Sequence, residues 1–451
     1  MPLRAARLAL VALAAPLPAA GQAPAPVAFE NVTVIPMDSE RRLGGQTVVV
    51  ENGRITALGP AARVTVPAGA TRVDGRGRFL IPGLTETHGH LPAGNAPPES
   101  VDRILQLYLL NGVTTVRGML GHPAQLEWRA QAAAWQRLAP RLIVAGPSFN
   151  GNSATSPEVA TRMVEEQKAA GYDLLKIHPG VSRAAFDAMA AAAHRVGIPF
   201  AGHVPLDVGL HRAIEARYAS IDHLDGFVEA LIRDGAPVTP AQTAWFGLGL
   251  VEHLDRAKLA PLARAAREAG VWVNATETLM QTMAADGQPE AMLADPSMRY
   301  LPEAQVTAWA NSVRNLQNGP GNGPERRAAY LELRTWLIRS LHEAGVGMLL
   351  GSDAPQIGNV PGFSTLAELE LLAHAGLSPF EALATGTRNV GRYLGEPDVG
   401  TIAVGHRADL VLLDADPLLD VSNVRRQAGV MALGRWLPRA EIERRLAGLR
   451  R

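Results

Sequence analysis

The chain reads IPGLTETHGH from Ile81 to His90, an apolar run that ends in two histidines separated by one residue. In an extended strand the side chains of residues i and i+2 point to the same face. The imidazoles of His88 and His90 can therefore reach one metal ion. A buried structural pair of histidines would give the same pattern, so the rest of the chain has to supply the other ligands.

Four further residues of ligand type follow short apolar runs elsewhere in the chain. They are Lys176, His203, His223 and Asp353. In α/β barrels the chemistry lies at the carboxyl ends of parallel strands, where such residues would stand. Each histidine alone is more often a satisfied core residue, and the Gly-Ser-Asp sequence at 351–353 alone is compatible with a helix N-cap. Six such residues, each at an expected strand end, predict one metal site.

Strands and helices alternate between residues 81 and 399 with roughly the period of a (β/α)8 TIM-type barrel, which makes this part of the chain an α/β domain. Beyond the strand before His88, the strand candidates are 114–116, 141–145, 174–177, 199–203, 220–223, 271–274 and 347–351. An open, doubly wound sheet is the alternative. Ligands from so many strands converge more easily in a closed barrel.

Two β-rich stretches, 27–80 and 400–437, flank the barrel. Together they predict one small, discontinuous β-sandwich domain formed from both termini; two independent hairpins, the alternative, would be marginally stable. Residues 278–334 hold no good strand and include a Gly/Pro-rich elbow at 318–324. They predict a helical insertion, which is either a lid over the site or a plain excursion into solvent.

The composition excludes several classes of protein. The 43 basic and 43 acidic residues give a formal net charge of zero, and no basic run suggests a nucleic-acid partner. The chain has no cysteine, which excludes disulfides, thiolate ligands and a cysteine nucleophile. A metal must therefore be held by nitrogen and oxygen atoms.

The first residues resemble an export signal. Arg4 and Arg7 form a positive region, residues 8–15 form an apolar core, and residues 16–23 form a cleavage region rich in small residues. We expect a signal peptide over residues 1–22, cleaved near 20–23, and a periplasmic or secreted protein. A disordered or anchoring N-terminus is the alternative. Neither the apolar core nor any later segment is long enough to span a bilayer.

Neutral imidazole and carboxylate groups suit zinc, and manganese or cobalt accepts the same ligands. A bound divalent ion can lower the pKa of its water from about 15.7 to about 7. Asp353 could bind an ion, take the proton of the attacking water and pass it to the leaving group. Lys176 is the exception, because an unmodified ammonium carries only donors and repels cations. Taken alone it is an ion-pair lysine of the barrel core.

The motifs around His88 and His90, Lys176-Ile177, Gly202-His203, Asp222-His223 and Gly351-Ser352-Asp353 resemble the amidohydrolase superfamily. More narrowly, they resemble its imidazolonepropionase-related and prolidase-like branch. The ending GTIAVGHRADL from Gly400 to Leu410 resembles that superfamily's return to its β domain. The resemblance covers residues 27–437, nearly all of the expected mature chain.

The resemblance implies two divalent metal ions. His88, His90 and Asp353 would hold the first ion, and His203 and His223 the second. Lys176 would be carboxylated by carbon dioxide and would bridge the two ions as a carbamate. The chain departs from the family at two points, which leave the substrate open: Glu86 stands where the family more often has aspartate, and no acidic residue follows Arg117.

Four residues are candidates for substrate binding. Arg117 could clamp a carboxylate through its planar fork, or form a structural ion pair. His178 could grip a substrate carboxylate or orient a ligand, or simply be a loop histidine. Asn150 and Gln356 belong to the two loops, 149–153 and 356–363, that we expect to wall the pocket.

We therefore predict an exported, binuclear metal-dependent amidohydrolase that cleaves an amide bond in a small-molecule substrate. A dipeptide or an N-acyl amino acid is expected, as for a prolidase-like peptidase. Esters, lactones, carbamates and cyclic amides remain alternatives because they also present a polarisable carbonyl. A non-catalytic metal-binding barrel is the other alternative, against which the complete ligand set argues. The resemblance also makes a homo-oligomer an option.

Overall fold

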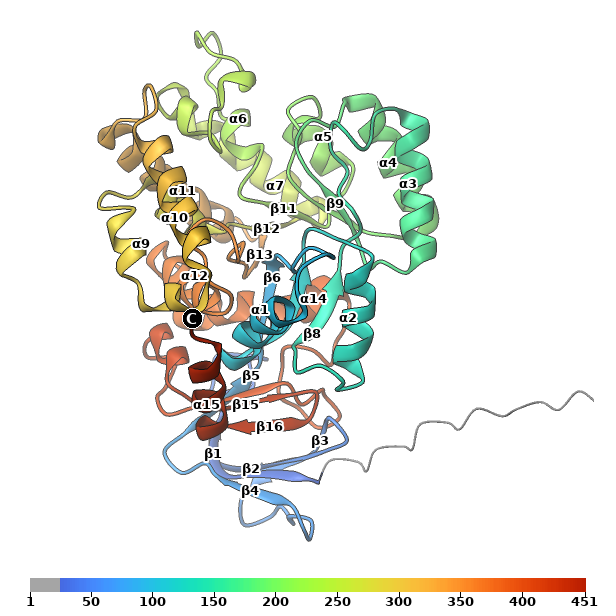
Figure 1. Cartoon of the computed structure of the whole chain (residues 1–451), viewed down its shortest axis with the longest axis vertical. Helices are drawn as coiled ribbons and strands as arrows, with labels where there is room; N and C mark the ends of the chain where they lie inside the picture. Colours follow the sequence, from blue (N-terminus) through green and yellow to red (C-terminus); the bar gives the residue numbers. More distant parts are fainter. Residues whose placement is uncertain (1–24) are drawn as a thin grey trace, which may run out of the picture.

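The computed structural model describes residues 25–451, so the predicted signal peptide lies outside the described residues. Strands from both ends of the chain gather at one end of the molecule, and the α/β part occupies the other (Figure 1). None of the helices formed by residues 25–451 is long and apolar enough to cross a membrane.

The sheet at the first end combines strands from both termini in the order β16-β15-β14-β5-β1-β2-β3, with β4 paired to β1. Its strands are β1 (Val27–Val34), β2 (Leu43–Glu51), β3 (Arg54–Pro60), β4 (Thr71–Asp74), β5 (Phe79–Pro82), β14 (Leu410–Leu413), β15 (Gln427–Ala432) and β16 (Arg435–Pro438). Strand β14 runs antiparallel to β5, which joins the two ends of the chain. The sequence predicts a two-layer sandwich here, whereas these pairings give a single sheet of eight strands.

The α/β part contains two sheets whose strands are all parallel, β6-β7-β8 and β9 to β13. The strands are β6 (Leu84–Gly89), β7 (Val113–Gly118), β8 (Arg141–Val144), β9 (Leu175–Ile177), β10 (Phe200–Gly202), β11 (Ser220–Asp222), β12 (Trp272–Asn274) and β13 (Gly347–Leu349). All of these strands lie close to the strand candidates of the sequence.

Backbone contacts connect the two parallel sheets at both of their edges. Ala145, after β8, forms a parallel bridge with Leu174, before β9. At the other edge the N–H of Thr87 donates to the carbonyl of Leu350 at 2.8 Å, and the N–H of Asp353 donates to that of His88 at 2.8 Å. This mixed α/β fold is of the TIM-barrel type, and the contacts bring the end of β6 beside the loop that follows β13.

Helices connect successive strands. They are α1 (Pro98–Leu110), α2 (Ala124–Ala133), α3 (Pro157–Ala170), α4 (Arg183–Val196), α5 (Gly209–Glu215), α6 (Phe227–Ala230), α7 (Leu259–Ala269), α12 (Phe363–His374), α13 (Pro379–Thr385) and α14 (Arg388–Leu394), and α15 (Arg439–Leu449) ends the chain. Short 3-10 helices are η1 (Pro240–Gln242), η2 (Leu248–His253), η3 (Arg256–Lys258), η4 (Pro296–Tyr300) and η5 (Val421–Arg425). The hydroxyls of Ser156 and Ser182 cap α3 and α4, because each accepts a backbone N–H of the first turn.

Between β12 and β13 the chain is helical. It forms α8 (Glu277–Ala284), α9 (Glu290–Ala294), α10 (Glu303–Gln317) and α11 (Pro324–Glu343). Leu279 and Met283 of α8 pack with Val313 of α10 in a small apolar cluster. The long helix α11 returns the chain to the barrel, and its residues reach the loops that carry the candidate ligands. Movement of this segment as a lid stays a prediction.

Candidate metal centre

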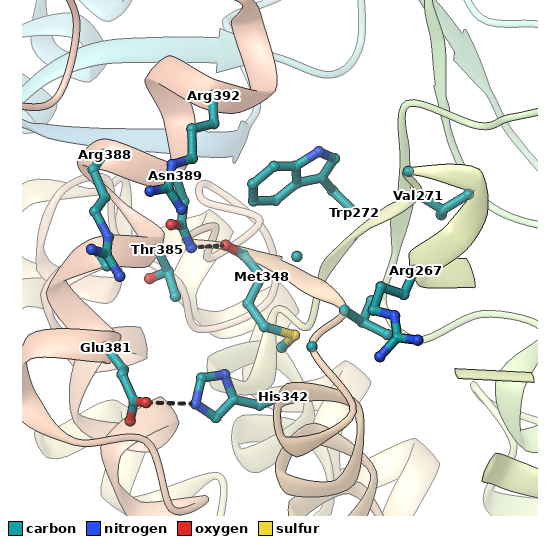
Figure 2. A pocket seen from close by; sticks show the side chains of 15 residues that line it. Arg267, Val271, Trp272, His342, Met348, Glu381, Thr385, Arg388, Asn389 and Arg392 are labelled. Atoms are coloured by element: carbon teal, nitrogen blue, oxygen red, sulfur yellow. Dashed lines mark hydrogen bonds and ion pairs between the residues drawn. The ribbon is translucent and has the colours of Figure 1, made fainter. Parts of the chain in front are cut away.

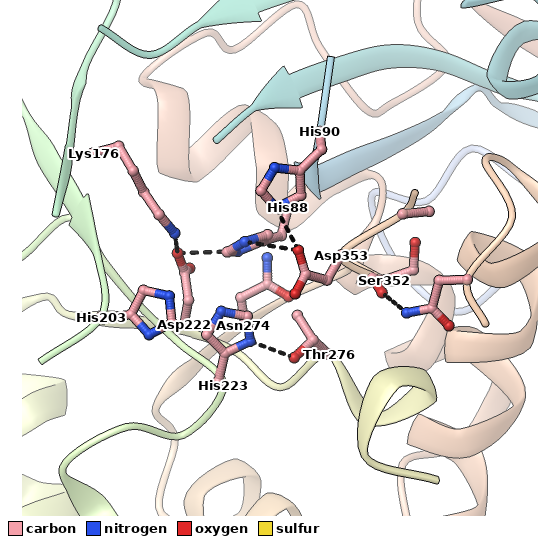
Figure 3. Close-up of polar contacts among 12 residues, drawn as sticks. His88, His90, Lys176, His203, Asp222, His223, Asn274, Thr276, Ser352 and Asp353 are labelled. Atoms are coloured by element: carbon pink, nitrogen blue, oxygen red, sulfur yellow. Dashed lines mark hydrogen bonds and ion pairs between the residues drawn. The ribbon is translucent and has the colours of Figure 1, made fainter. Parts of the chain in front are cut away.

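Three of the predicted ligands converge at the joined edge of the two sheets. His88 lies in β6 and His90 directly follows it, while Asp353 lies in the loop after β13 (Figure 3). Oδ1 of Asp353 is 2.6 Å from Nε2 of His90 and 3.4 Å from Nε2 of His88. One ligand atom from each residue lies within 4.8 Å of the others. Two nitrogens and one oxygen are thus close enough to share one ion.

The protonation states of these residues fit a divalent cation. Burial is the main reason that the pKa of His88 falls to about 4, so its imidazole is neutral at pH 7. Burial alone would raise the pKa of Asp353, but the neighbouring His88 and His90 outweigh it and lower that pKa. The buried Oδ1 of Asp353 also has no hydrogen-bond donor. A carboxylate oxygen facing two imidazole nitrogens is a donor set that zinc and similar ions accept.

Glu86 ties the two ligand-bearing segments together. Its carboxyl group accepts the backbone N–H of His88 at 3.0 Å and that of Ser352 at 2.8 Å. The hydroxyls of Ser352 and Thr365 donate to its other oxygen, each at 2.6 Å. Burial raises the pKa of Glu86 to about 7. The residue that departs from the family pattern therefore fixes the spacing between His88 and Asp353.

The second predicted pair lies beside the first. The ring centroids of His203 and His223 are 4.6 Å apart, and those of His88 and His223 are 4.7 Å apart. Nδ1 of His203 is 2.7 Å from Oδ2 of Asp225, and Nδ1 of His223 is 2.7 Å from the hydroxyl of Thr276. Contacts of this kind fix the ring orientation and leave Nε2 for an ion. His203 and His223 thus lie beside the His88-His90-Asp353 group, each with Nε2 as its candidate ligand atom.

Backbone strain is concentrated among these residues. His223, Thr276 and Asp353 have φ values of 62°, 51° and 63°. Residues other than glycine rarely adopt this left-handed conformation, which costs on the order of 1 kcal/mol or more for each. Strain of this kind persists where the surrounding structure holds a side chain in a required direction. Here it turns all three side chains toward the centre.

Lys176 contacts an acidic residue that the sequence did not single out as a site residue. Its Nζ lies 3.0 Å from Oδ2 of Asp222, and the same oxygen lies 3.0 Å from Nδ1 of His88. All three side chains are buried. Burial alone would raise the pKa of Asp222, but His88 and Lys176 outweigh it and hold that pKa well below its ordinary value. Asp222 is therefore an anion that orients the His88 ring through Nδ1, while Nε2 faces Asp353.

Replacing Asp222 by asparagine is expected to weaken metal binding about 10- to 100-fold, the usual effect of losing an outer partner of a ligand histidine. The neutral amide keeps one acceptor but removes the charge that orients His88. Competition of metal-loaded protein with a chromophoric chelator measures the change. Asp173→Asn, at a half-exposed ion pair with Arg129, is the matched control. Equal affinities in the two variants would contradict this role.

Arg117 is placed differently from the predicted carboxylate clamp. Its guanidinium is buried and donates to the carbonyl of Thr87, to the hydroxyl of Tyr393 and, at 3.0 Å, to that of Ser220. It also lies 3.7 Å from Asp222. All three guanidinium nitrogens have partners inside the protein, so the structural ion pair is the interpretation that fits.

The other three substrate candidates lie in loops. The side-chain oxygen Oδ1 of Asn150 accepts the N–H groups of Asn152 and Ser153 at 2.9 and 3.1 Å, so this side chain shapes its own loop. The ring centroid of His178 lies 5.1 Å from that of His203, and its buried Nδ1 has no partner. Burial, with Lys176 and His203, lowers the pKa of His178 to about 2. Gln356 is exposed. His178 therefore stays a candidate for substrate binding, because its ring lies beside that of His203.

A separate cavity of about 380 Å³ lies at the amino ends of β12 and β13 (Figure 2). Trp272, Met348 and Arg392 line it, and His342 pairs there with Glu381 at 3.2 Å. The candidate ligands follow the carboxyl ends of their strands, so this cavity is at the opposite end of β12 and β13 and does not belong to the metal centre.

Comparisons with known proteins agree with this arrangement. The model of the amidohydrolase family matches residues 79–437. An imidazolonepropionase of Ectopseudomonas mendocina (strain ymp) is 28% identical over 390 residues, which cover 82% of this chain and 86% of that protein. A crystal structure from Bifidobacterium longum, named as a candidate prolidase, is 25% identical with a TM-score of 0.68 and covers 94% of this chain and 99% of its own. A bottromycin amidohydrolase, 24% identical, has the same fold, with a TM-score of 0.72 over 94% of this chain and 91% of its own.

Proposed function

Because this chain belongs to the amidohydrolase family, we propose that it is an exported, binuclear enzyme that cleaves the amide bond of a dipeptide or an N-acyl amino acid. Family and relatives establish a metal-dependent hydrolase acting on carbon–nitrogen bonds. The further details, which are the two ions, the substrate and export, are our proposal. The observation that carries metal-dependent hydrolysis in this proposal is the convergence of His88, His90 and Asp353 on one point.

The donor set favours zinc, with manganese or cobalt as alternatives, because only imidazole and carboxylate groups are offered. Divalent ions bound there would polarise the scissile carbonyl and make a water molecule acidic enough to react near neutral pH. His203 and His223, oriented by Asp225 and Thr276, would hold the second ion.

The chain's own residues would move the protons. Asp353 is ionised at neutral pH, since its pKa lies below the ordinary value, and its carboxylate is the acceptor that we propose for the proton of the attacking water. It would then pass that proton to the leaving nitrogen, which departs as a neutral amine. Asp222 keeps the His88 ring in place during this transfer.

Lys176 is proposed to be carboxylated in the active protein. Carboxylation turns a cation that only donates into an anion that can hold two ions. Lys176 is fully buried with its Nζ beside His88 and Asp222, so the modified group would be anchored within the centre. Mass spectrometry of intact protein kept in bicarbonate tests this point through the added mass of carbon dioxide.

A hydrolysis screen tests the function. Mature protein, loaded with zinc in bicarbonate, is compared with an aliquot stripped by a chelator, on dipeptides, N-acyl amino acids, esters, lactones, carbamates and cyclic amides. We expect cleavage of dipeptides or N-acyl amino acids that disappears on stripping and returns with zinc. Cleavage confined to another class would replace the proposed substrate, and absence of both cleavage and stably bound metal would refute the proposal.

A further inference from the structure

An aromatic side chain lies against both histidines of the second pair. The ring centroid of Phe246 is 5.1 Å from that of His223 and 6.1 Å from that of His203. Phe246 belongs to the connection between β11 and β12, beyond the strand ends that carry the candidate ligands. The residue is only partly buried, so part of its surface remains accessible.

The position of Phe246 is held from the helical segment between β12 and β13. Its backbone is left-handed, with φ at 48°, and its carbonyl accepts the hydroxyl of Tyr330 on α11 at 3.0 Å. Trp245 packs against Phe246 and Tyr330, and its ring centroid lies 5.2 Å from that of Phe246 and 6.0 Å from that of Tyr330. A strained backbone that is fixed on two sides presents one ring in one direction.

The contacts of His203 and His223 show which part of the centre Phe246 faces. Both histidines use Nδ1 for Asp225 and Thr276, so Nε2 is the atom left to ligate. The ring of Phe246 packs on these two imidazoles, so it borders the space next to the ion that His203 and His223 are proposed to hold. Under the proposed function, one side of the substrate would lie in this space. An aromatic wall there favours an apolar group and gives a polar group no hydrogen-bond partner.

We propose that Phe246 is a specificity-determining residue, and that the substrate carries an apolar group next to the scissile bond on the side of His203 and His223. This inference rests on the proposed function and narrows its substrates to amides with an apolar flank. The contact of one apolar group with a pocket wall changes the ratio of kcat/KM between two substrates by about 10- to 200-fold. Tyr330 acts as a positioning residue for the ring.

Two series of dipeptides and N-acyl amino acids test the proposal. One series varies the group on the acyl side of the scissile bond among glycine, serine, leucine and phenylalanine, and the other varies the amine side in the same way. We expect the wild type to show a kcat/KM ratio of apolar to polar members of at least about 10 in one series. Phe246→Ser should bring that ratio near 1, and Phe246→Leu should keep part of it.

Two further variants separate direct contact from general damage. Tyr330→Phe removes only the hydroxyl that holds the Phe246 carbonyl, so it should lower the ratio while the metal content stays at the wild-type level. Phe79→Leu, at a partly buried phenylalanine of β5 in the terminal sheet, is the matched control and should leave the ratio unchanged.

The outcomes distinguish this inference from the proposed function. Metal-dependent hydrolysis with an unchanged ratio in Phe246→Ser overturns the inference and leaves the function standing, as does a wild type without any preference. If no member is cleaved, the proposed function fails. In that case calorimetry compares N-acetylleucine with N-acetylserine on zinc-loaded protein, and equal binding overturns the role of Phe246.

Discussion

Replacing Asp353 by asparagine is expected to lower kcat by about 10²- to 10⁴-fold, the usual contribution of a general acid–base group. Asparagine has nearly the same shape and keeps one oxygen near His90, but it cannot take a proton from water at neutral pH. The carboxylate of Asp353 is ionised at neutral pH, since its pKa lies below the ordinary value, and it offers the proton acceptor that the amide lacks. The expected loss is in kcat, since proton transfer occurs in the reaction step.

Metal content separates the two roles of Asp353. Because it is also a candidate ligand, Asp353→Asn is assayed at saturating zinc, with bound zinc measured by elemental analysis on the same sample. Asp286→Asn, at an exposed carboxylate paired with Arg327, is the matched control and should keep wild-type kcat. Full turnover by zinc-loaded Asp353→Asn would refute the proton shuttle.

Replacing Arg334 by methionine is expected to lower the free energy of unfolding by about 3–5 kcal/mol, the cost of breaking a buried ion pair from one side. Nε of Arg334 is 2.8 Å from Glu277, and both side chains are almost fully buried. The same guanidinium donates to the carbonyls of His223 and Ala275 at 3.0 and 2.8 Å. The variant would therefore remove the charged partner of a buried carboxylate and take one donor from each of two backbone carbonyls.

Urea unfolding measures this loss of stability. The protein is first stripped of metal, so that bound zinc does not add to the free energy of unfolding. The double variant Glu277→Gln with Arg334→Met removes both charges, so it should lose less stability than Arg334→Met alone. Arg334→Met should also weaken binding at the proposed second metal site, because the guanidinium that it removes donates to the carbonyl of the strained residue His223. A single variant as stable as wild type would show that the pair contributes nothing.

The parallel strands and the convergence of His88, His90 and Asp353 could be predicted from the sequence, because both follow from local patterns. Apolar runs mark buried strands, and a ligand at the end of each run lies at the same edge of a parallel array. His88 and His90 needed only the two-residue period of a strand. Such local rules carry information wherever the backbone stays regular.

The neighbours of these ligands could not be predicted in the same way. In a regular strand Asp222 and His223 would point to opposite faces, but the left-handed backbone at His223 breaks the alternation and turns both toward the centre. The contact between Phe246 and Tyr330 joins residues 84 positions apart, for which no spacing rule exists. The single terminal sheet likewise depends on pairings between the two chain ends.

The distance along the sequence between β6 and β13 determines when, during synthesis and folding, the ligands of the proposed first ion come together. Thr87 and Leu350, which bond where the two parallel sheets meet, are 263 residues apart. A nascent polypeptide therefore carries His88 and His90 long before Asp353 is synthesised. Contacts this distant form late and slowly. We therefore expect the site to bind zinc only after the segment that carries Asp353 has been made and has closed on β6.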